Sequence, residues 1–167
     1  MNPARYHLLA TRTLTTEGRR ETLCMAALGI VGEAVEVFRT KAPDTPHEKR
    51  IKEVGDVCWY LATAMDALGM DPLTTWIAEP EPAVFAWPDT ASRVVEDAGA
   101  VSEAAKKHIF HARDDSALRA AIPRLAATLR AAARVLGVDI EEVWRVNVEK
   151  LNERHPEQFS GDYAPET

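Results

Sequence analysis

The sequence predicts an all-α fold, a bundle of packed helices, and three observations support this prediction. Alanine, leucine, glutamate and arginine are abundant, which favours helix. Apolar residues recur at spacings of three and four along several long segments. The 8 glycines and 10 prolines are few for 167 residues, and they are clustered. Because 46% of the residues are hydrophobic, these helices have enough apolar surface to form a core.

Local start and stop signals divide the first half of the chain into four helical segments. Thr15 or Thr16 is a candidate N-cap for the long second segment. Thr45 and Glu48 form a candidate capping box before the third segment, with proline at its first helical position. Gly69 is well placed to end that segment. The expected helices span residues 6–13, from the threonine cap to about 41, 46–68 and 72–76.

A proline-rich connection separates the two halves. Pro80, Pro82 and Pro88 exclude a helix interior there. Phe85 and Trp87 are apolar, so we expect this connection to pack on the surface of the bundle. The helices expected after it span residues 89–111, 115–136 and 139–154.

Two of the helices in the first half carry pairs of acidic residues. Glu33 and Glu36 lie on one helix, and Glu53 and Asp56 lie on the next. Residues three apart on a helix point the same way. Four carboxylates on facing helices would repel one another unless a cation lay between them. Oxygen ligands suit a hard ion, so the sequence predicts a four-carboxylate site for Mg²⁺, with Mn²⁺ as the other candidate.

The acid pairs lie beside the apolar faces of their helices, as a turn of about 100° per residue shows. Tyr60 falls on the same side of its helix as Glu53 and Asp56. We therefore expect a cleft where the two helices meet. The expected core residues on these helices are Leu23, Ala27, Ile30, Ala34, Phe38, Ile51, Val54, Cys58, Leu61, Met65 and Leu68.

The second half of the chain repeats the pattern of the first. Gly69, Asp71 and Trp76 recur as glycine, aspartate and tryptophan 68 residues later. A shift of 67 aligns Glu36 with Glu103 and Glu33 with alanine, and the shift of 68 places alanine opposite Glu53 and arginine opposite Asp56. This pattern indicates a diverged internal duplication within one compact domain. The predicted parts are a catalytic helical unit with the metal site at 1–78, a connection at 79–90, a degenerate second unit with the closing helix at 91–160, and a tail at 161–167.

Charge and composition indicate which kinds of partner and which cellular compartment to expect. The formal net charge of −6 argues against a dedicated nucleic-acid-binding protein, which needs clustered lysine and arginine. No apolar run is long enough to cross a bilayer, and the first 12 residues lack the apolar core of a signal peptide. Cys24 and Cys58 fall in apolar segments, which favours free thiols in a reducing compartment. We expect a soluble, cytoplasmic protein with no nucleic-acid or membrane partner.

Taken together, the E-x-x-E and E-x-x-D pairs on consecutive helices resemble the signature of the MazG-like all-α nucleoside triphosphate pyrophosphohydrolases. Residues 147–151, Asn-Val-Glu-Lys-Leu, are similar to the closing Asn-x-x-Lys-Leu segment of that family. The resemblance covers residues 23–68 and 139–159 and is weaker over 76–136. The extra degenerate helix pair departs from the single-unit members.

The resemblance implies a magnesium-dependent enzyme that cleaves ribo- or deoxyribonucleoside triphosphates between the α and β phosphates. The products would be the monophosphate and pyrophosphate. An acidic pocket can bind such a dense anion only through metal ions. By match to the motif, the metal ligands would be Glu33, Glu36, Glu53 and Asp56. One of them, Glu36 or Glu53, would instead orient the attacking water as a base.

Four further residues are candidates for substrate binding. Tyr60 follows Asp56 by one turn and would meet the sugar or base, and Asn147 and Lys150 lie in the closing segment. Lys150 and Arg154 are four apart near a helix end. Cations at that place are equally typical of an interaction with the helix dipole.

Several alternatives stay open at the level of sequence. The same fold would also suit a dUTPase or a phosphoribosyl-ATP pyrophosphohydrolase. A different class is a non-catalytic helical module that binds nucleotides or a partner protein. The assembly is open as well, because either the second unit or a second chain would complete the bundle. We expect a homodimer, since the family generally closes its core through subunit contacts.

Overall fold

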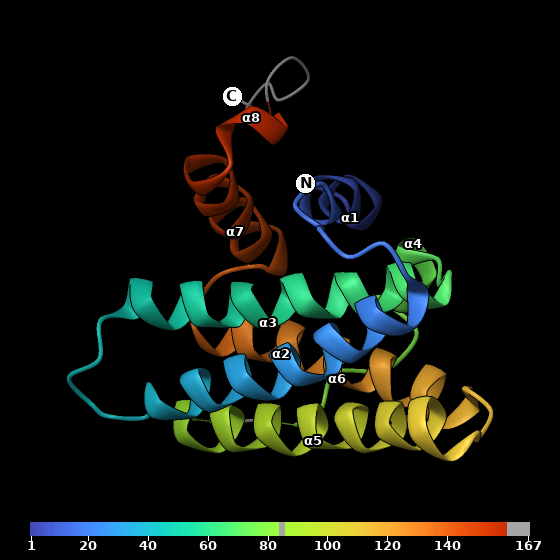
Figure 1. Ribbon diagram of the computed structural model, residues 1–167. Coiled ribbons are helices and arrows are strands. Elements are labelled where there is room, and N and C mark those ends of the chain that lie inside the picture. Colours follow the sequence, from blue (N-terminus) through green and yellow to red (C-terminus); the bar gives the residue numbers. More distant parts are fainter. Residues whose placement is uncertain (84–85, 160–167) are drawn as a thin grey trace.

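The computed structural model describes residues 1–83 and 86–159, and these residues form eight helices and no strand (Figure 1). The prediction of an all-α fold is therefore confirmed for the described part of the chain. The helices are α1 (Pro3–Thr11), α2 (Arg19–Arg39), α3 (His47–Leu68), α4 (Pro72–Thr75), α5 (Trp87–His111), α6 (Ser116–Val135), α7 (Ile140–Arg154) and α8 (Pro156–Phe159).

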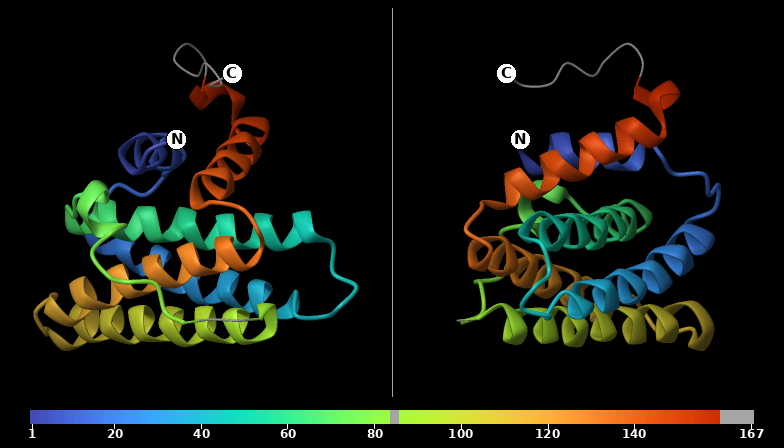
Figure 2. Two further views of the ribbon diagram at one scale, coloured as in Figure 1. Left: turned by 180° about the vertical axis from the view of Figure 1, so that it is seen from behind. Right: turned by 90° about the vertical axis from the view of Figure 1, so that its left-hand side faces the viewer.

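Two helical hairpins make the body of the molecule. Helix α2 packs against α3 and α5, α5 packs against α6, and α6 also contacts α3. Helices α1 and α7 contact each other and lie across α3, on the side away from α5 (Figures 1 and 2). Helix α3 is therefore bordered by α1 and α7 on this side, and the candidate site forms along it.

The core follows the predicted apolar faces with one exception. The core positions expected on α3 are all buried, and so are those expected on α2 up to Ala34. Phe38 was wrongly predicted, because its ring is 43% exposed and lies under the ammonium group of Lys41. Val37, one residue earlier, is fully buried in its place. Buried side chains from α1 to α7 form one apolar cluster.

Several predicted helix ends are confirmed. Gly69 caps the C-terminus of α3 with a positive φ of 60°, a left-handed conformation that glycine adopts without steric cost. The carboxylate of Asp139 accepts a hydrogen bond from the Glu142 backbone N–H at 2.8 Å and so caps α7. Asp71 caps α4 in the same way. These ends are set by local hydrogen bonds, which is why sequence signals locate them.

Two predicted caps are wrong. Helix α2 begins at Arg19 without a side-chain cap, because the hydroxyl group of Thr16 is hydrogen-bonded to the hydroxyl group of Thr22 at 2.7 Å. Helix α3 begins after Pro46, also without a side-chain cap. Thr45 belongs to the preceding turn, and Glu48 forms an ion pair within the helix instead of closing a capping box.

The connection before α5 is shorter than predicted. Trp87 starts α5 and is buried, and its indole N–H donates to the backbone carbonyl of Thr40 at 3.1 Å. The connection is thereby anchored on the end of α2, as expected for Trp87. Phe85 lies outside the described residues, as does the tail from residue 160. Among the helices described, none is long and apolar enough to cross a membrane.

Candidate metal centre

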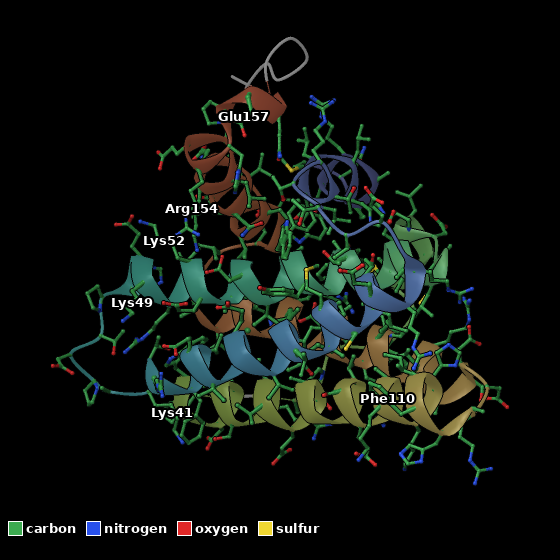
Figure 3. The ribbon with its side chains drawn as sticks, viewed as in Figure 1. Lys41, Lys49, Lys52, Phe110, Arg154 and Glu157 are labelled. Atoms are coloured by element: carbon green, nitrogen blue, oxygen red, sulfur yellow. The ribbon has the colours of Figure 1, made fainter. Side chains whose placement is uncertain are left out.

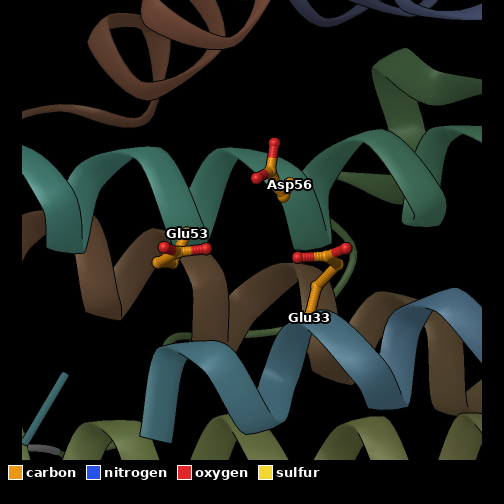
Figure 4. A group of neighbouring side chains, drawn as sticks. All are labelled: Glu33, Glu53 and Asp56. Atoms are coloured by element: carbon orange, nitrogen blue, oxygen red, sulfur yellow. The ribbon is translucent and has the colours of Figure 1, made fainter. Parts of the chain in front are cut away.

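Three of the four predicted carboxylates come together where α2 and α3 lie side by side, with Asp56 pointing away from α2 and toward α7 (Figure 4). Glu33 comes from α2, and Glu53 and Asp56 come from successive turns of α3. One carboxylate oxygen from each lies within 4.8 Å of the others, and all three residues are partly buried. We refer to these three residues as the acidic cluster.

Close packing around α3 fixes the cluster. A Cβ added at Gly55 would lie 3.0 Å from the Cβ of Asn147, so glycine is what allows α7 to approach the turn before Asp56. A Cβ added at Gly29 would lie only 2.1 Å from Cε1 of Tyr60. The Tyr60 ring therefore lies directly against the backbone of α2, one turn before Glu33.

The electrostatic environment of the cluster favours a cation. Burial raises the pKa of Glu33, and the charges of Asp56 and Glu53 raise it further. Burial likewise raises the pKa of Glu53, with the charge of Asp56 as the next cause. Lys150 opposes both shifts but does not cancel them. Added positive charge at this place would therefore stabilise the ionised carboxylates.

Glu36 lies beside the cluster and is not part of it. Its carboxylate forms an ion pair with Arg39 on the next turn of α2, and 41% of its side chain is exposed. Its charge still contributes to the raised pKa values of Glu33 and Glu53. The fourth predicted ligand is thus near enough to interact with the cluster electrostatically, while its carboxylate is held by Arg39.

Two residues of α7 contact the carboxylate of Asp56. The ammonium group of Lys150 forms an ion pair with Oδ2, and the side-chain amide of Asn147 donates to Oδ1 at 3.3 Å. Asn147 is almost completely buried and accepts a hydrogen bond from the hydroxyl group of Tyr6 at 3.0 Å. A chain of hydrogen bonds therefore runs from α1 through α7 to the acidic cluster.

A pocket of about 210 Å³ opens next to the cluster, between α3, α7 and the end of α1. Three of the residues predicted to bind substrate, Tyr60, Lys150 and Arg154, line this pocket, whereas Asn147 lies behind Asp56 and not in the wall. The lining residues are Thr13, Glu33, Asp56, Trp59, Tyr60, Lys150, Leu151, Arg154 and His155.

Thr13, Trp59 and His155 are pocket residues that the sequence did not indicate. Trp59 is only partly buried and meets the Tyr60 ring edge-on, with the two ring centroids 4.6 Å apart. Its indole N–H donates to the hydroxyl group of Thr13 at 3.0 Å. The position of Trp59 beside Tyr60 was the available signal. Thr13 and His155 lie beyond the ends of α1 and α7, and no signal in the sequence pointed to them.

Several basic side chains lie on the side of the molecule where α7 is close to the first turns of α3. Lys49, Lys52 and Arg154 lie on this side (Figure 3). Lys49 is close enough to lower the pKa of Glu53. Lys52 is ion-paired with Glu48, so Lys150 and Arg154, which line the pocket, are the cations best placed to meet an anion there.

Comparison of the chain with protein-family models, with curated proteins and with solved structures found no match.

Proposed function

We propose that the protein is a magnesium-dependent nucleoside triphosphate pyrophosphohydrolase. The observation that carries this proposal is the acidic cluster on α2 and α3, opening onto a pocket with aromatic and cationic walls. Such a pocket combines the three requirements of a nucleotide site: a place for metal, positive charge for phosphates, and flat rings for a base or sugar.

The residues present fit a hard divalent ion. The donors are carboxylate oxygens, which Mg²⁺ and Mn²⁺ prefer. Burial, and after it the charge of Asp56, raises the pKa of both Glu33 and Glu53, and a bound cation would offset both causes. Glu33, Glu53 and Asp56 would hold the ion, with Glu36 available from the adjoining turn. When bound, the ion supplies charge neutralisation for the phosphates and acidifies a water molecule.

The remaining residues take complementary roles in this proposal. Lys150 and Arg154 bind phosphate oxygens, and Tyr60 with Trp59 forms the wall against which the sugar or base lies. Glu36 or Glu53 orients the attacking water as a base. We assign Asn147 to positioning and not to substrate contact, because its buried amide holds Asp56 from behind.

The fold also supports the proposed internal duplication. Gly69 and Gly137 both end a helix hairpin with positive φ, at 60° and 73°. Trp76 and Trp144, which correspond under the repeat, are both buried and meet edge-on at 4.9 Å. Contact between corresponding residues is what a pseudo-twofold axis between two units would produce.

The packing of helices matches such an axis. Helix α4, which follows the first hairpin, contacts α6, and α7, which follows the second hairpin, contacts α3. Glu36 pairs with Arg39 three residues later, and Glu103 pairs with Lys106 in the same way. In this proposal the second unit covers the core of the first within one chain.

A product assay tests the proposed reaction. The purified chain would be incubated with each of the common ribo- and deoxyribonucleoside triphosphates, with dUTP and with phosphoribosyl-ATP, in magnesium and in chelator. We expect monophosphate and pyrophosphate, with a loss of about a hundredfold or more in Glu53→Gln. Glu36→Gln should lose activity, whereas Glu103→Gln, its matched control in the second unit, should not.

Other outcomes separate the alternatives. Turnover of dUTP alone would identify a dUTPase, and turnover of phosphoribosyl-ATP alone would identify that pyrophosphohydrolase. Diphosphate and phosphate as products would refute the proposed cleavage position. Nucleotide binding without any turnover would support a non-catalytic module.

A further inference from the structure

The outward side of α2 is apolar and exposed. Between Thr22 and Phe38 the charged residues are Glu33 and Glu36, whose charges interact with those on α3. Leu28, on the opposite side of the helix from the core, is 70% exposed. The described helices α3 and α5 flank α2 on its other sides, and no described helix covers the outward side (Figures 1 and 2). A helix that is apolar all round is normally buried all round.

This outward side has a regular order. Six residues follow one another at spacings of 4, 3, 4, 3 and 4, which places them in one stripe along the helix. All six are exposed or partly exposed. We call this stripe the α2 seam, and it consists of Glu21, Met25, Leu28, Gly32, Val35 and Arg39.

The seam is complementary to itself when two copies run antiparallel about residue 30. Leu28 then faces Gly32 of the other copy, Met25 faces Val35, and Glu21 faces Arg39. Each contact occurs twice because of the twofold symmetry. The charges at the two ends of the seam are opposite in sign, so this alignment pairs acid with base at both ends. Arg39 has further N–H donors beyond its pair with Glu36.

Gly32 gives an independent indication. Glycine inside a helix costs stability relative to alanine, and nothing lies within 4 Å of a Cβ built at Gly32. No packing within the chain therefore accounts for this glycine. A large side chain from outside would find space there, and Leu28 is the side chain that the antiparallel alignment brings to it.

The second hairpin lacks this stripe. On α5, Gly99 also has open space around it, but the positions seven before and three after are Ser92 and Ser102. The corresponding seam residues on α2 are Met25 and Val35. The apolar stripe is therefore a property of α2 alone and not of the helical pattern that the hairpins share.

We propose that the α2 seam binds the α2 seam of a second copy of this chain, antiparallel, with Leu28 of each copy lying over Gly32 of the other. This contact joins finished bundles and does not complete a core, because α5 and α6 already cover α2 and α3. The proposal is independent of the proposed chemistry of the acidic cluster.

Sedimentation velocity over a concentration series of the full chain tests the proposal. We expect a dimer whose dissociation constant rises about tenfold or more in Leu28→Glu. Ile77→Glu is the matched control, because Ile77, which follows the C-cap of α4 and is not part of α2, is also 70% exposed, and it should leave the dimer unchanged.

Two further variants exclude a simple failure to fold. Gly32→Leu fills the space that Leu28 would occupy, so it should weaken the dimer while the thermal stability of the monomer is kept or raised. Glu21→Arg places arginine opposite Arg39 at both ends and should weaken the dimer by about tenfold. The double variant Glu21→Arg, Arg39→Glu restores opposite charges and should restore the dimer.

The outcomes that overturn the proposal are distinct. A chain that stays monomeric at every concentration would refute the proposed dimer. A dimer that persists in both Leu28→Glu and Gly32→Leu would place the contact elsewhere. A double charge variant no tighter than Glu21→Arg alone would refute the antiparallel alignment.

Discussion

Gly29→Ala tests whether the Tyr60 ring lies against the backbone of α2 as described. The new Cβ would lie 2.1 Å from Cε1, 2.3 Å from Cδ1 and 2.4 Å from Cζ of Tyr60. Ordinary van der Waals contact begins at 3.4 Å, so the ring would have to retreat by about 1.3 Å. Tyr60 is a wall of the pocket, and this movement would reshape the proposed sugar or base site.

The expected free energies follow from two opposing effects. Replacing a helical glycine with alanine normally stabilises a protein by about 1 kcal/mol. Overpacking of this kind costs about 1–3 kcal/mol. Gly29→Ala should therefore lower the free energy of unfolding by up to about 2 kcal/mol. Gly99→Ala is the matched control, since nothing lies near a Cβ at that position, and it should raise the free energy by about 1 kcal/mol.

Thermal and urea unfolding of both variants measure the difference. We expect Gly29→Ala to melt about 2–12 °C below Gly99→Ala, given about 2–4 °C for each kcal/mol in a chain of this size. Nucleotide binding should weaken in Gly29→Ala alone. Equal stabilisation by both substitutions would refute the contact between Tyr60 and α2.

Three further predictions concern the cluster and its neighbours. Tyr6→Phe removes the hydroxyl group that donates to Asn147. It should lower the free energy of unfolding, measured in urea, by about 1 kcal/mol and weaken Mg²⁺ binding, measured by calorimetry. Unchanged Mg²⁺ binding would mean that the contact from α1 does not affect the site. In the absence of metal, Glu53→Gln should be more stable than the natural chain at neutral pH. The gap should close as the pH falls toward 4.5, because the raised pKa of Glu53 stabilises the folded state only at low pH; a gap that widens would contradict the direction of that shift. Lys150→Met removes the cation beside the cluster, so it should tighten Mg²⁺ binding without nucleotide and weaken nucleotide binding, whereas weaker Mg²⁺ binding would mean that Lys150 assists the metal.

The fold was predictable where it depends on local pattern. The apolar arc of α3 from Ile51 to Leu68 is buried as its spacing indicates. Gly69 and Asp139 mark helix ends through hydrogen bonds with near neighbours in sequence. Phe38 was mispredicted because it lies in the last turn of α2, where the helix reaches the edge of the core. In this turn Val37 is the buried residue.

The acidic cluster was predictable in part for the same reason. Glu33, Glu53 and Asp56 lie on consecutive helices, so their positions on the helix faces suffice to bring them together. The Tyr6 contact joins residues 141 apart, and no local pattern records such a pairing. Glu36 pairs with Arg39 because of the rotamer that its side chain adopts, and the sequence does not specify that rotamer.

The hydrogen-bonded chain from Tyr6 through Asn147 to Asp56 also has a consequence for synthesis of the protein. Helices α2 and α3 leave the ribosome before α7 has been made, so a growing chain carries the acids without the cation of Lys150 or the rest of the pocket wall. An unfinished chain therefore cannot form the complete site. Any activity of this site begins only when α7 has been added, and a chain cut short before residue 140 would be inactive although every acidic residue of the cluster is intact.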